Sequence, residues 1–418
     1  MPVYAPVDGS RLAGALAEIP PVRDRLGGDA ASWRIREVGD GNLNLVFIVE
    51  GPAGGVVVKQ ALPYVRLVGE SWPLPLERSW FEYSALVEQA RHAPGLTPEV
   101  FHFDRAQALI VMEYLSPHVI MRKGLIGAVE YPRFADDIAI FLAATLFNTS
   151  VLAGTAAEHK ARVELFAANV ALCRITEDLV FTDPYREAPL NRWTRPWLDG
   201  QKRAFERDSA LKVAAQARKH QFMTGAQALI HGDLHTGSIM LTPQDTRVID
   251  PEFAFVGPIG FDVGAVIGNL LLAFFAQEGH EAAPGARDAY REWILLQAQD
   301  VWSGFHERFL ALWRQARAGD AYPAGLFASE EDRLTMDKER ARFMRVLFED
   351  TLAFAGAKMI RRILGLAHVE DLEAIADPER RARCEAKALR LARDLLVDAK
   401  DFSGLADVAD AARAIGRG

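Results

Sequence analysis

The chain has 418 residues, of which 50% are hydrophobic and 25% are charged, and its formal net charge is -8. This length and composition can bury a large core and form two lobes. The negative charge gives no attraction toward nucleic acid or anionic membranes, so we expect neither as a partner.

The sequence contains neither a recognisable targeting signal nor a cluster of cysteines. The N-terminus lacks a basic segment followed by an apolar core, so the sequence predicts no secretory signal peptide. We also find no apolar run approaching the roughly 20 residues of a membrane span. Cys173 and Cys384 lie far apart, without further ligands at metal-binding spacing. We interpret them as reduced thiols and expect a cytoplasmic protein.

The first quarter of the chain predicts an antiparallel sheet with one helix. The turn from Gly51 to Gly55 joins two β-rich runs, and the second run ends in Lys59. Helix formers follow, before Pro94 and Gly95 close that segment. The predicted elements are strands over 45–50 and 56–59, a helix over 76–92, and strands over 100–103 and 108–112.

The remainder predicts a mostly helical lobe with one exception. From Leu229 to Asp250, short β-like runs are separated by tight turns around Gly232 and Pro243. We therefore predict an α+β fold with an N-terminal lobe over 1–115 and a helical lobe over 116–418. The predicted helices cover 134–149, 204–220, 262–277, 288–315, 330–364 and 378–399.

One polar turn has the composition of a catalytic loop. His231 and Gly232 precede Asp233 directly after a strand, and Ser238 adds a hydroxyl five residues later. Phosphoryl transfer needs a group that orients the attacking hydroxyl and accepts its proton. We predict that Asp233 is this base. A lone aspartate after a glycine is usually a turn residue, so the prediction depends on the other motifs.

A second carboxylate motif follows this loop. Asp250 and Glu252 stand at i and i+2, so both side chains would face one side if the backbone were extended. Two carboxylates on one side suit Mg²⁺, which prefers oxygen ligands. The motif predicts a site for Mg²⁺ beside ATP.

A turn of small and polar residues before the first hairpin indicates phosphate binding. Its candidate ATP-binding residues are Gly39, Asp40, Gly41, Asn42 and Asn44. Glycines in such a turn let backbone amides approach phosphate oxygens closely. The turn alone is a weak signal.

Further ATP contacts are predicted downstream. The Lys59 ammonium can reach nucleotide phosphates, and Glu82 on the following helix is its candidate partner, although Glu82 also fits a solvated helix face. The segment Glu113, Tyr114 and Leu115 follows an apolar strand where the two lobes meet. Its backbone could hold an adenine edge, which makes it a hinge candidate.

The ordered set of these residues resembles the protein-kinase-like fold. The resemblance is to its small-molecule kinase branch, which includes aminoglycoside phosphotransferases and choline kinases. Two positions depart from that branch: Ser238 stands where its members have Asn, and Asp250-Pro251-Glu252 replaces Asp-Phe-Gly. The Ser238 hydroxyl could bond a metal-bound water, with a shorter reach than Asn.

Longer blocks are similar to the 5-methylthioribose kinase family. The similarity spans about Gly39 to Asp371 and implies ATP-dependent phosphorylation of the 1-hydroxyl of 5-methylthioribose, in methionine salvage. The blocks are 40–44, 122–125, 181–184, 231–239, 250–262 and 361–362.

This resemblance also implies roles for individual residues and a homodimer. Asp233 would face the sugar 1-hydroxyl, and Asp262 would brace its loop. Arg361 or Arg362 would contact substrate or the transferring phosphate, because a guanidinium group suits phosphate oxygens. Adjacent helical residues point about 100° apart, so entry of both into one pocket would be unusual. Trp72 would belong to a tryptophan-containing loop near the cleft, although a simple packing role fits equally well.

Three alternatives remain at this stage. A kinase of aminoglycoside or choline type would act on a different acceptor. A catalytically inactive, kinase-like nucleotide-binding module would have lost a catalytic or metal carboxylate, yet Lys59, Asp233, Asp250 and Glu252 are all present. A protein kinase would need an activation segment, and the stretch between Asp250 and Asp262 is too short for one.

Overall fold

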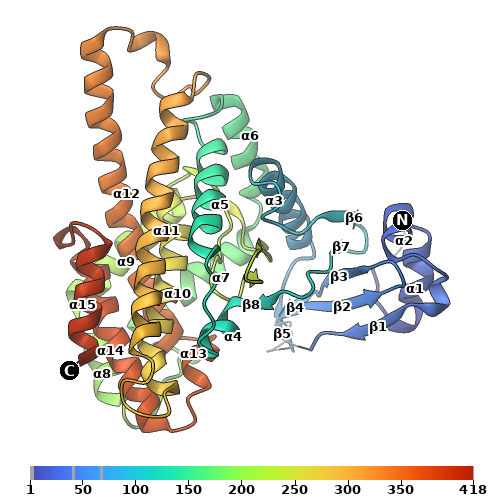
Figure 1. The fold of residues 1–418 in the computed structure, drawn as a ribbon, viewed down its shortest axis with the longest axis horizontal. Coiled ribbons are helices and arrows are strands. Elements are labelled where there is room, and N and C mark those ends of the chain that lie inside the picture. Colours follow the sequence, from blue (N-terminus) through green and yellow to red (C-terminus); the bar gives the residue numbers. More distant parts are fainter. Residues whose placement is uncertain (1–3, 40–42, 66–68, 418) are drawn as a thin grey trace.

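Two regions of different architecture follow one another along the chain (Figure 1). The computed structural model describes residues 4–39, 43–65 and 69–417. A five-stranded antiparallel sheet, in the order β1-β2-β3-β7-β6, occupies the N-terminal region, and the remainder is mostly helical, which confirms the α+β prediction. The boundary near Leu115 stays a prediction. The elements of the sheet region are α1 (Gly9–Ala17), α2 (Pro20–Leu26), β1 (Arg34–Glu37), β2 (Asn44–Glu50), β3 (Gly55–Ala61), β4 (Tyr64–Val65), β5 (Gly69–Pro73), α3 (Arg78–His92), β6 (Val100–Asp104) and β7 (Leu109–Glu113).

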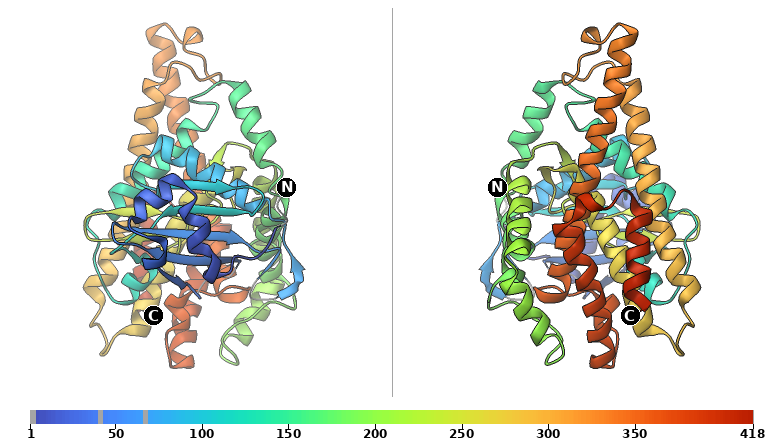
Figure 2. Two further views of the ribbon diagram at one scale, coloured as in Figure 1. Left: turned by 90° about the vertical axis from the view of Figure 1, so that its right-hand side faces the viewer. Right: turned by 90° about the vertical axis from the view of Figure 1, so that its left-hand side faces the viewer.

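Both faces of this sheet are covered by helices. Successive side chains of β3 point to opposite faces, as the pleat requires. Val56 and Val58 pack with residues of α1 and α2, whereas Val57 packs with Leu86 of α3 on the other face, which Lys59 shares. Figure 2 shows α1 and α2 in front of the sheet in its left view. Neither helix is predicted from the sequence, because nine and seven residues are too few for a clear helical period.

The helical region agrees closely with the sequence for its long helices. The predicted ranges 288–315 and 330–364 are the observed bounds of α11 and α12. The prediction of one helix over 204–220 was wrong, because Asp208 accepts a hydrogen bond from the Leu211 amide at 2.9 Å and starts a second helix there. The helices are α4 (Met121–Ile126), α5 (Phe134–Asn148), α6 (Ala156–Phe166), α7 (Val170–Leu179), α8 (Asp199–Arg207), α9 (Ser209–Thr224), α10 (Ile259–His280), α11 (Asp288–Gln315), α12 (Glu330–Leu364), α13 (Glu370–Glu373), α14 (Pro378–Val397) and α15 (Leu405–Arg417).

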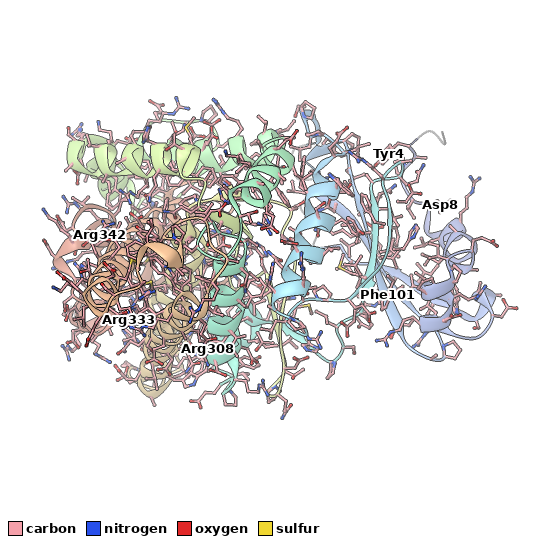
Figure 3. The ribbon with its side chains drawn as sticks, turned by 90° about the horizontal axis from the view of Figure 1, so that it is seen from above. Tyr4, Asp8, Phe101, Arg308, Arg333 and Arg342 are labelled. Atoms are coloured by element: carbon pink, nitrogen blue, oxygen red, sulfur yellow. The ribbon has the colours of Figure 1, made fainter. Side chains whose placement is uncertain are left out.

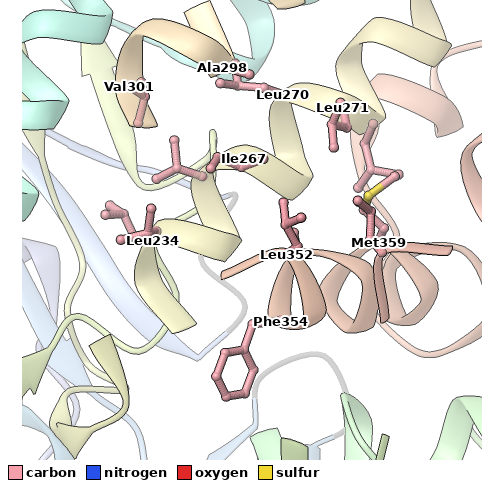
Figure 4. Packing of buried hydrophobic residues seen from close by; sticks show 14 of the residues in the cluster. Leu234, Ile267, Leu270, Leu271, Ala298, Val301, Leu352, Phe354 and Met359 are labelled. Atoms are coloured by element: carbon pink, nitrogen blue, oxygen red, sulfur yellow. The ribbon is translucent and has the colours of Figure 1, made fainter. Parts of the chain in front are cut away.

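The helix α10 forms the centre of the core. Within the described ranges it alone is long and apolar enough to cross a membrane, and its apolar window is 100% buried in the fold. The expectation that no such run exists was therefore wrong, because α10 extends the predicted 262–277 helix at both ends. Figure 4 shows Ile267 and Leu271 on the side of α10 that faces Leu352 and Met359, and Leu270 beside Ala298 of α11.

Glycines bring α10 and α12 unusually close together. A Cβ atom at Gly264 would lie only 2.5 Å from the carbonyl oxygen of Thr351, and one at Gly268 would lie 2.9 Å from that of Ala355. Only glycine allows this approach, because it has no side chain. The contact fixes the position of α12, including the turn from Lys358 to Arg362.

Short strands in the helical region frame two polar loops. Strand β9 pairs with β12, and β10 pairs with β11 and β8. The loop 231–238 lies between β9 and β10, and the loop 249–254 lies between β11 and β12. These strands are β8 (Val119–Ile120), β9 (Ala228–Ile230), β10 (Ile239–Leu241), β11 (Thr246–Val248) and β12 (Phe255–Gly257).

Candidate active site

The loop after β9 is held in a single conformation by its neighbours. Gly232 has φ +83°, and a Cβ there would lie 2.2 Å from the Phe253 carbonyl oxygen, so glycine is required. The Asp262 carboxylate accepts hydrogen bonds from the amides of His231 at 2.6 Å and Gly232 at 3.0 Å. Leu234 is buried in the main core (Figure 4). Asp262 thus occupies the bracing position that the resemblance implied.

His231 and Ser238 tie the loop together from within. The imidazole Nε2 of His231 hydrogen-bonds the Ile249 carbonyl at 2.9 Å, which connects this loop to the Asp250 loop. Burial lowers the pKa of His231, so the ring is neutral near pH 7. The Ser238 hydroxyl donates to the backbone carbonyl of Asp233 at 3.0 Å. In this structure Ser238 therefore shapes the backbone beneath Asp233.

The Asp233 carboxylate lies between two cations, Lys358 and Arg362, and the imidazole of His235. Lys358 Nζ donates to Oδ1 at 2.8 Å, and Arg362 Nη2 lies 3.6 Å from the same oxygen. His235 Nε2 lies 3.4 Å from Oδ2. Burial alone would raise the pKa of Asp233, but Lys358, His235 and Arg362 lower it well below its usual range. Asp233 is thus ionised throughout the physiological range.

Sequence reasoning missed the contacts of Lys358 and His235 with Asp233. A signal for Lys358 was present, because Lys358, Arg361 and Arg362 stand at i, i+3 and i+4, on one face of a helix. They interrupt a stretch of α12 whose other residues, from Leu352 to Leu364, are nearly all apolar. Cations inside an apolar, buried stretch indicate an anionic partner.

Three arginines meet near Asp233. Arg361 and Arg362 are 9% and 6% exposed, so both enter the interior, contrary to the expectation that one would point away. Burial lowers the pKa of Arg361, and the charge of Asp233 acts in the opposite direction. Arg122 of α4 forms an ion pair with Asp371 at 2.9 Å. Nitrogens of all three guanidinium groups are buried without a hydrogen-bond partner in the structure.

Asp250 and Glu252 converge as predicted, but for a different reason. The backbone is not extended there: β11 ends at Val248, and Asp250 adopts the left-handed conformation with φ 68°. This conformation is strained for a residue other than glycine. It brings one oxygen each of Glu82, Asp250 and Glu252 within 4.8 Å of one another.

Glu252 is bound to the sheet region. Arg78 of α3, 1% exposed, contacts its Oε2 at 3.0 Å, and the Asn44 amide donates to the same oxygen at 3.0 Å. Arg78 also donates to the carbonyls of Leu43 at 2.6 Å and Leu62 at 2.9 Å. The Asn44 side chain holds Glu252 and contacts Arg78, and its predicted role in ATP binding stays a prediction.

Lys59 connects the two carboxylates that flank it. Its ammonium contacts Glu82 at 2.7 Å and also Asp250, so the structure places Lys59 and Glu82 together as predicted. Burial would lower the pKa of Lys59, but the charges of Asp250 and Glu82 raise it above its usual value. Burial raises the pKa of Glu82 to about 7, against the effect of Lys59.

The remaining predicted residues lie around this centre. Trp72, on β5, is partly buried with Leu74, and both line a cavity of about 360 Å³ against α7. Glu113 ends β7 and forms an ion pair with Arg247 at 3.3 Å, which joins the hinge segment to β11. The Tyr114 hydroxyl hydrogen-bonds Arg36 at 3.3 Å, and Leu115 is buried. Their roles toward adenine stay predictions.

Part of the turn predicted to bind phosphate falls outside the described residues. These are Asp40, Gly41 and Asn42, whereas Gly39 lies in a turn before them. A larger cavity of about 430 Å³ lies elsewhere, between α11, α12 and their connection, near Arg333 (Figure 3). Cavity size therefore does not identify the site, and the charged groups do.

The fold and the site together define a phosphotransferase. The model of the phosphotransferase enzyme family matches residues 34–305. That range contains Lys59, Asp233, Asp250 and Glu252 and ends before α12, which carries Lys358 and the arginine pair. Among solved structures, ethanolamine kinase from Plasmodium vivax is 11% identical, with a TM-score of 0.45 and coverage of 93% of this chain and 96% of that chain. A structural similarity this weak supports no conclusion about function.

Curated relatives extend over nearly the whole chain. Methylthioribose kinase 1 of Oryza sativa subsp. japonica is 48% identical over 408 residues, covering 97% of this chain and 94% of the relative. Methylthioribose kinase of Escherichia coli O45:K1 (strain S88 / ExPEC) is 46% identical, covering 98% of each. The chain belongs to the methylthioribose kinases within the phosphotransferase enzyme family.

Proposed function

We propose that this protein transfers the γ-phosphoryl group of ATP to the 1-hydroxyl of 5-methylthioribose. The observation that carries the proposal is the convergence of Asp233 with buried cations, next to a second centre where Lys59 meets Asp250. The first centre suits an acceptor hydroxyl and a phosphoryl group, and the second suits nucleotide phosphates. Membership of the methylthioribose kinases supports the choice of acceptor.

The reaction places each group in a defined role. The acceptor hydroxyl hydrogen-bonds Asp233, its oxygen forms a bond to the γ-phosphorus, and its proton passes to the carboxylate. The bond from the γ-phosphorus to the bridging oxygen of ADP breaks, and ADP leaves with that electron pair. Arg361 and Arg362 offer unpaired N–H groups to the phosphoryl oxygens, where negative charge must be balanced.

The carboxylates beside Lys59 fit a divalent cation. The contacts of Asp250 and Glu252 fall on Oδ1 and Oε2, so each keeps a second oxygen for Mg²⁺ within the described structure. Bound Mg²⁺ neutralises charge on the nucleotide phosphates. Glu82 belongs to the same group of oxygens but is engaged by Lys59, so we assign the metal to Asp250 and Glu252.

The proposal also covers Trp72, the hinge segment, the cellular location and the oligomeric state. We assign Trp72 and the cavity beside it to the substrate side, since the apolar part of its lining suits a thiomethyl group, while charged side chains such as Arg174 also line it. The Glu113 to Leu115 segment and the turn at Gly39 are assigned to ATP. We propose a cytoplasmic homodimer, in line with the sequence-based expectation.

A coupled ADP-release assay tests the proposal directly. Purified protein with Mg-ATP is offered 5-methylthioribose, ribose, choline, homoserine and kanamycin at equal concentrations. Selective turnover of 5-methylthioribose is expected. Turnover of a different acceptor would leave the kinase chemistry standing and overturn the substrate, and no turnover with any acceptor would favour an inactive nucleotide-binding module.

A further inference from the structure

Lys358 has an unusual environment for a lysine. It lies on α12, only 3% exposed, and its Nζ is 4.5 Å from the centre of the Phe261 ring. Its hydrogen bond in the structure is the 2.8 Å contact with Asp233 Oδ1. Burial lowers the pKa of Lys358, which the charge of Asp233 partly offsets. Among the described residues Asp233 is the carboxylate in direct contact with this charge, and a buried charge with so little pairing is costly, so packing alone does not account for it.

The packing of α12 does not need this lysine. The helix is fixed by its close contact with α10 at Gly264 and Gly268 and by apolar neighbours such as Met359 and Ile360, both fully buried. An apolar side chain of similar volume would serve that packing at least as well. The charge is therefore explained by what it does to Asp233.

The two oxygens of Asp233 have different surroundings. Lys358 and Arg362 both approach Oδ1, at 2.8 Å and 3.6 Å. On the other side, the Gly237 amide donates to His235 Nδ1 at 2.9 Å, which places the imidazole proton on Nε2, 3.4 Å from Oδ2. That distance is longer than a full hydrogen bond, so Oδ2 keeps capacity for another donor.

We propose that Lys358 is a positioning residue that holds Asp233 by Oδ1 and thereby reserves Oδ2 for the acceptor hydroxyl. This inference rests on the proposed phosphoryl transfer. The acceptor O–H donates to Oδ2, the oxygen attacks the γ-phosphorus, the proton moves to Oδ2, and ADP departs. In a loose transition state the direction of the hydroxyl matters more than the strength of the base, and a fixed carboxylate provides that direction.

A pH dependence follows from the charges facing Asp233. Lys358 lowers the pKa of Asp233, so its removal raises that pKa and moves the acidic limb of kcat to higher pH. A lysine with only a packing role would leave that limb in place. The charged and titratable groups facing the loop are Lys358, Arg361 and Arg362 from α12, His231 and His235 from the loop itself, Arg122 from α4 and Asp262 from α10.

The test compares Lys358→Met and Lys358→Arg with wild type, using Mg-ATP and the acceptor that wild type phosphorylates. For Lys358→Met we expect kcat to fall about 10- to 100-fold, an unchanged KM for ATP, and an acidic limb at higher pH. Lys358→Arg keeps the positive charge, so its acidic limb stays near the wild-type position. Wild-type kcat and pH dependence in folded Lys358→Met would overturn the proposal, as would a lower kcat with an unmoved limb.

A matched control is Lys387→Met. Lys387 also forms a 2.9 Å lysine–carboxylate pair, with Glu278 of α10, outside the site. We expect it to change the unfolding midpoint and leave the pH profile as in wild type.

A stability cycle separates this inference from the proposed function. If Lys358→Met does not fold, Lys358→Met/Asp233→Asn should fold, because it removes both charges of the pair. Additive effects of the two substitutions on unfolding would overturn the pairing. Wild-type protein inactive with every acceptor would instead overturn the proposed function, and the cycle would still test the Lys358 contact.

Discussion

The two carboxylate loops of this protein lie side by side, yet their charged partners come from different regions. Asp233 is surrounded by Lys358 and Arg362 of α12, in the helical region. Asp250 and Glu252 instead contact Lys59 of β3 and Arg78 of α3, in the sheet region. The bond from His231 to the Ile249 carbonyl links the two loops.

Substitutions in these two sets of partners should therefore have different consequences. The partners of Asp233 belong to the same region as its loop. Substituting them should therefore alter the chemistry at Asp233 and leave the relative position of the two regions unchanged. Partners of Glu252 join the regions, so changing them affects both nucleotide binding and the cohesion of the molecule. Substitutions among the two sets of partners test this contrast.

Arg78→Met should break the sheet-side connection. Arg78 and Glu252 are 1% and 5% exposed, so the substitution leaves a buried carboxylate without its main cation. We expect unfolding free energy to fall by about 3 to 5 kcal/mol. Urea denaturation measures this, with Arg174→Met as the control, because the Arg174–Asp178 pair is largely exposed and should contribute under about 1 kcal/mol. Equal losses of unfolding free energy in Arg78→Met and Arg174→Met would contradict the role of Arg78 in joining the two regions.

Asp233→Asn should affect the chemistry without weakening nucleotide binding. It removes the proposed proton acceptor and keeps Lys59 and Asp250 in place. We expect kcat to fall by a factor of about 100 or more. Affinity for a non-hydrolysable ATP analogue, measured by calorimetry, should stay near wild type. Turnover close to wild type would remove Asp233 from the catalytic role.

Arg362→Ala and Arg361→Ala should lower the rate more than the stability. Arg362 lies 3.6 Å from Asp233 and has unpaired buried nitrogens, so we expect the larger loss for Arg362→Ala, about 10- to 100-fold in kcat. Removing one of several neighbouring cations also relieves repulsion, which limits any loss of stability. Steady-state kinetics and thermal unfolding of both variants measure this, and wild-type kinetics in both would exclude the arginines from phosphoryl transfer.

Local sequence patterns predicted the parts of the fold that depend on short-range periodicity. They located α11, α12 and the hairpin of β2 and β3, and they singled out Asp233 as the candidate base and Asp250 with Glu252 as a carboxylate pair. They failed where the outcome depends on distant residues. The left-handed backbone at Asp250 occurs where its side chain meets Lys59 of β3, and the entry of both Arg361 and Arg362 depends on how α12 packs against α10. The role of Arg78 toward Glu252 joins residues 174 positions apart, which no local pattern reveals.

The smallest expected effect on stability is at an ion pair that lies outside the site and connects the sheet region to the helical region. Glu88 of α3 pairs with Arg162 of α6 at 3.0 Å and with His92 at 3.4 Å. The hydrogen bond with His92 and the charge of Arg162 outweigh burial and lower the pKa of Glu88 to about 2. A lowered carboxyl pKa stabilises the fold above the unfolded value near 4.5, and this stabilisation is lost as pH falls toward 2.

Glu88→Gln should therefore reduce unfolding free energy by about 1 kcal/mol at pH 7, after allowance for partial solvent exposure. The difference in unfolding free energy between wild type and variant should stay constant from pH 7 to about 4.5 and shrink from there to 3.5, because the stabilisation from the lowered pKa is lost only below the unfolded value. The kcat should stay unchanged, since this connection holds α3 against α6 away from Asp233. A stability difference that does not depend on pH would show that Glu88 acts through packing and not through its charge.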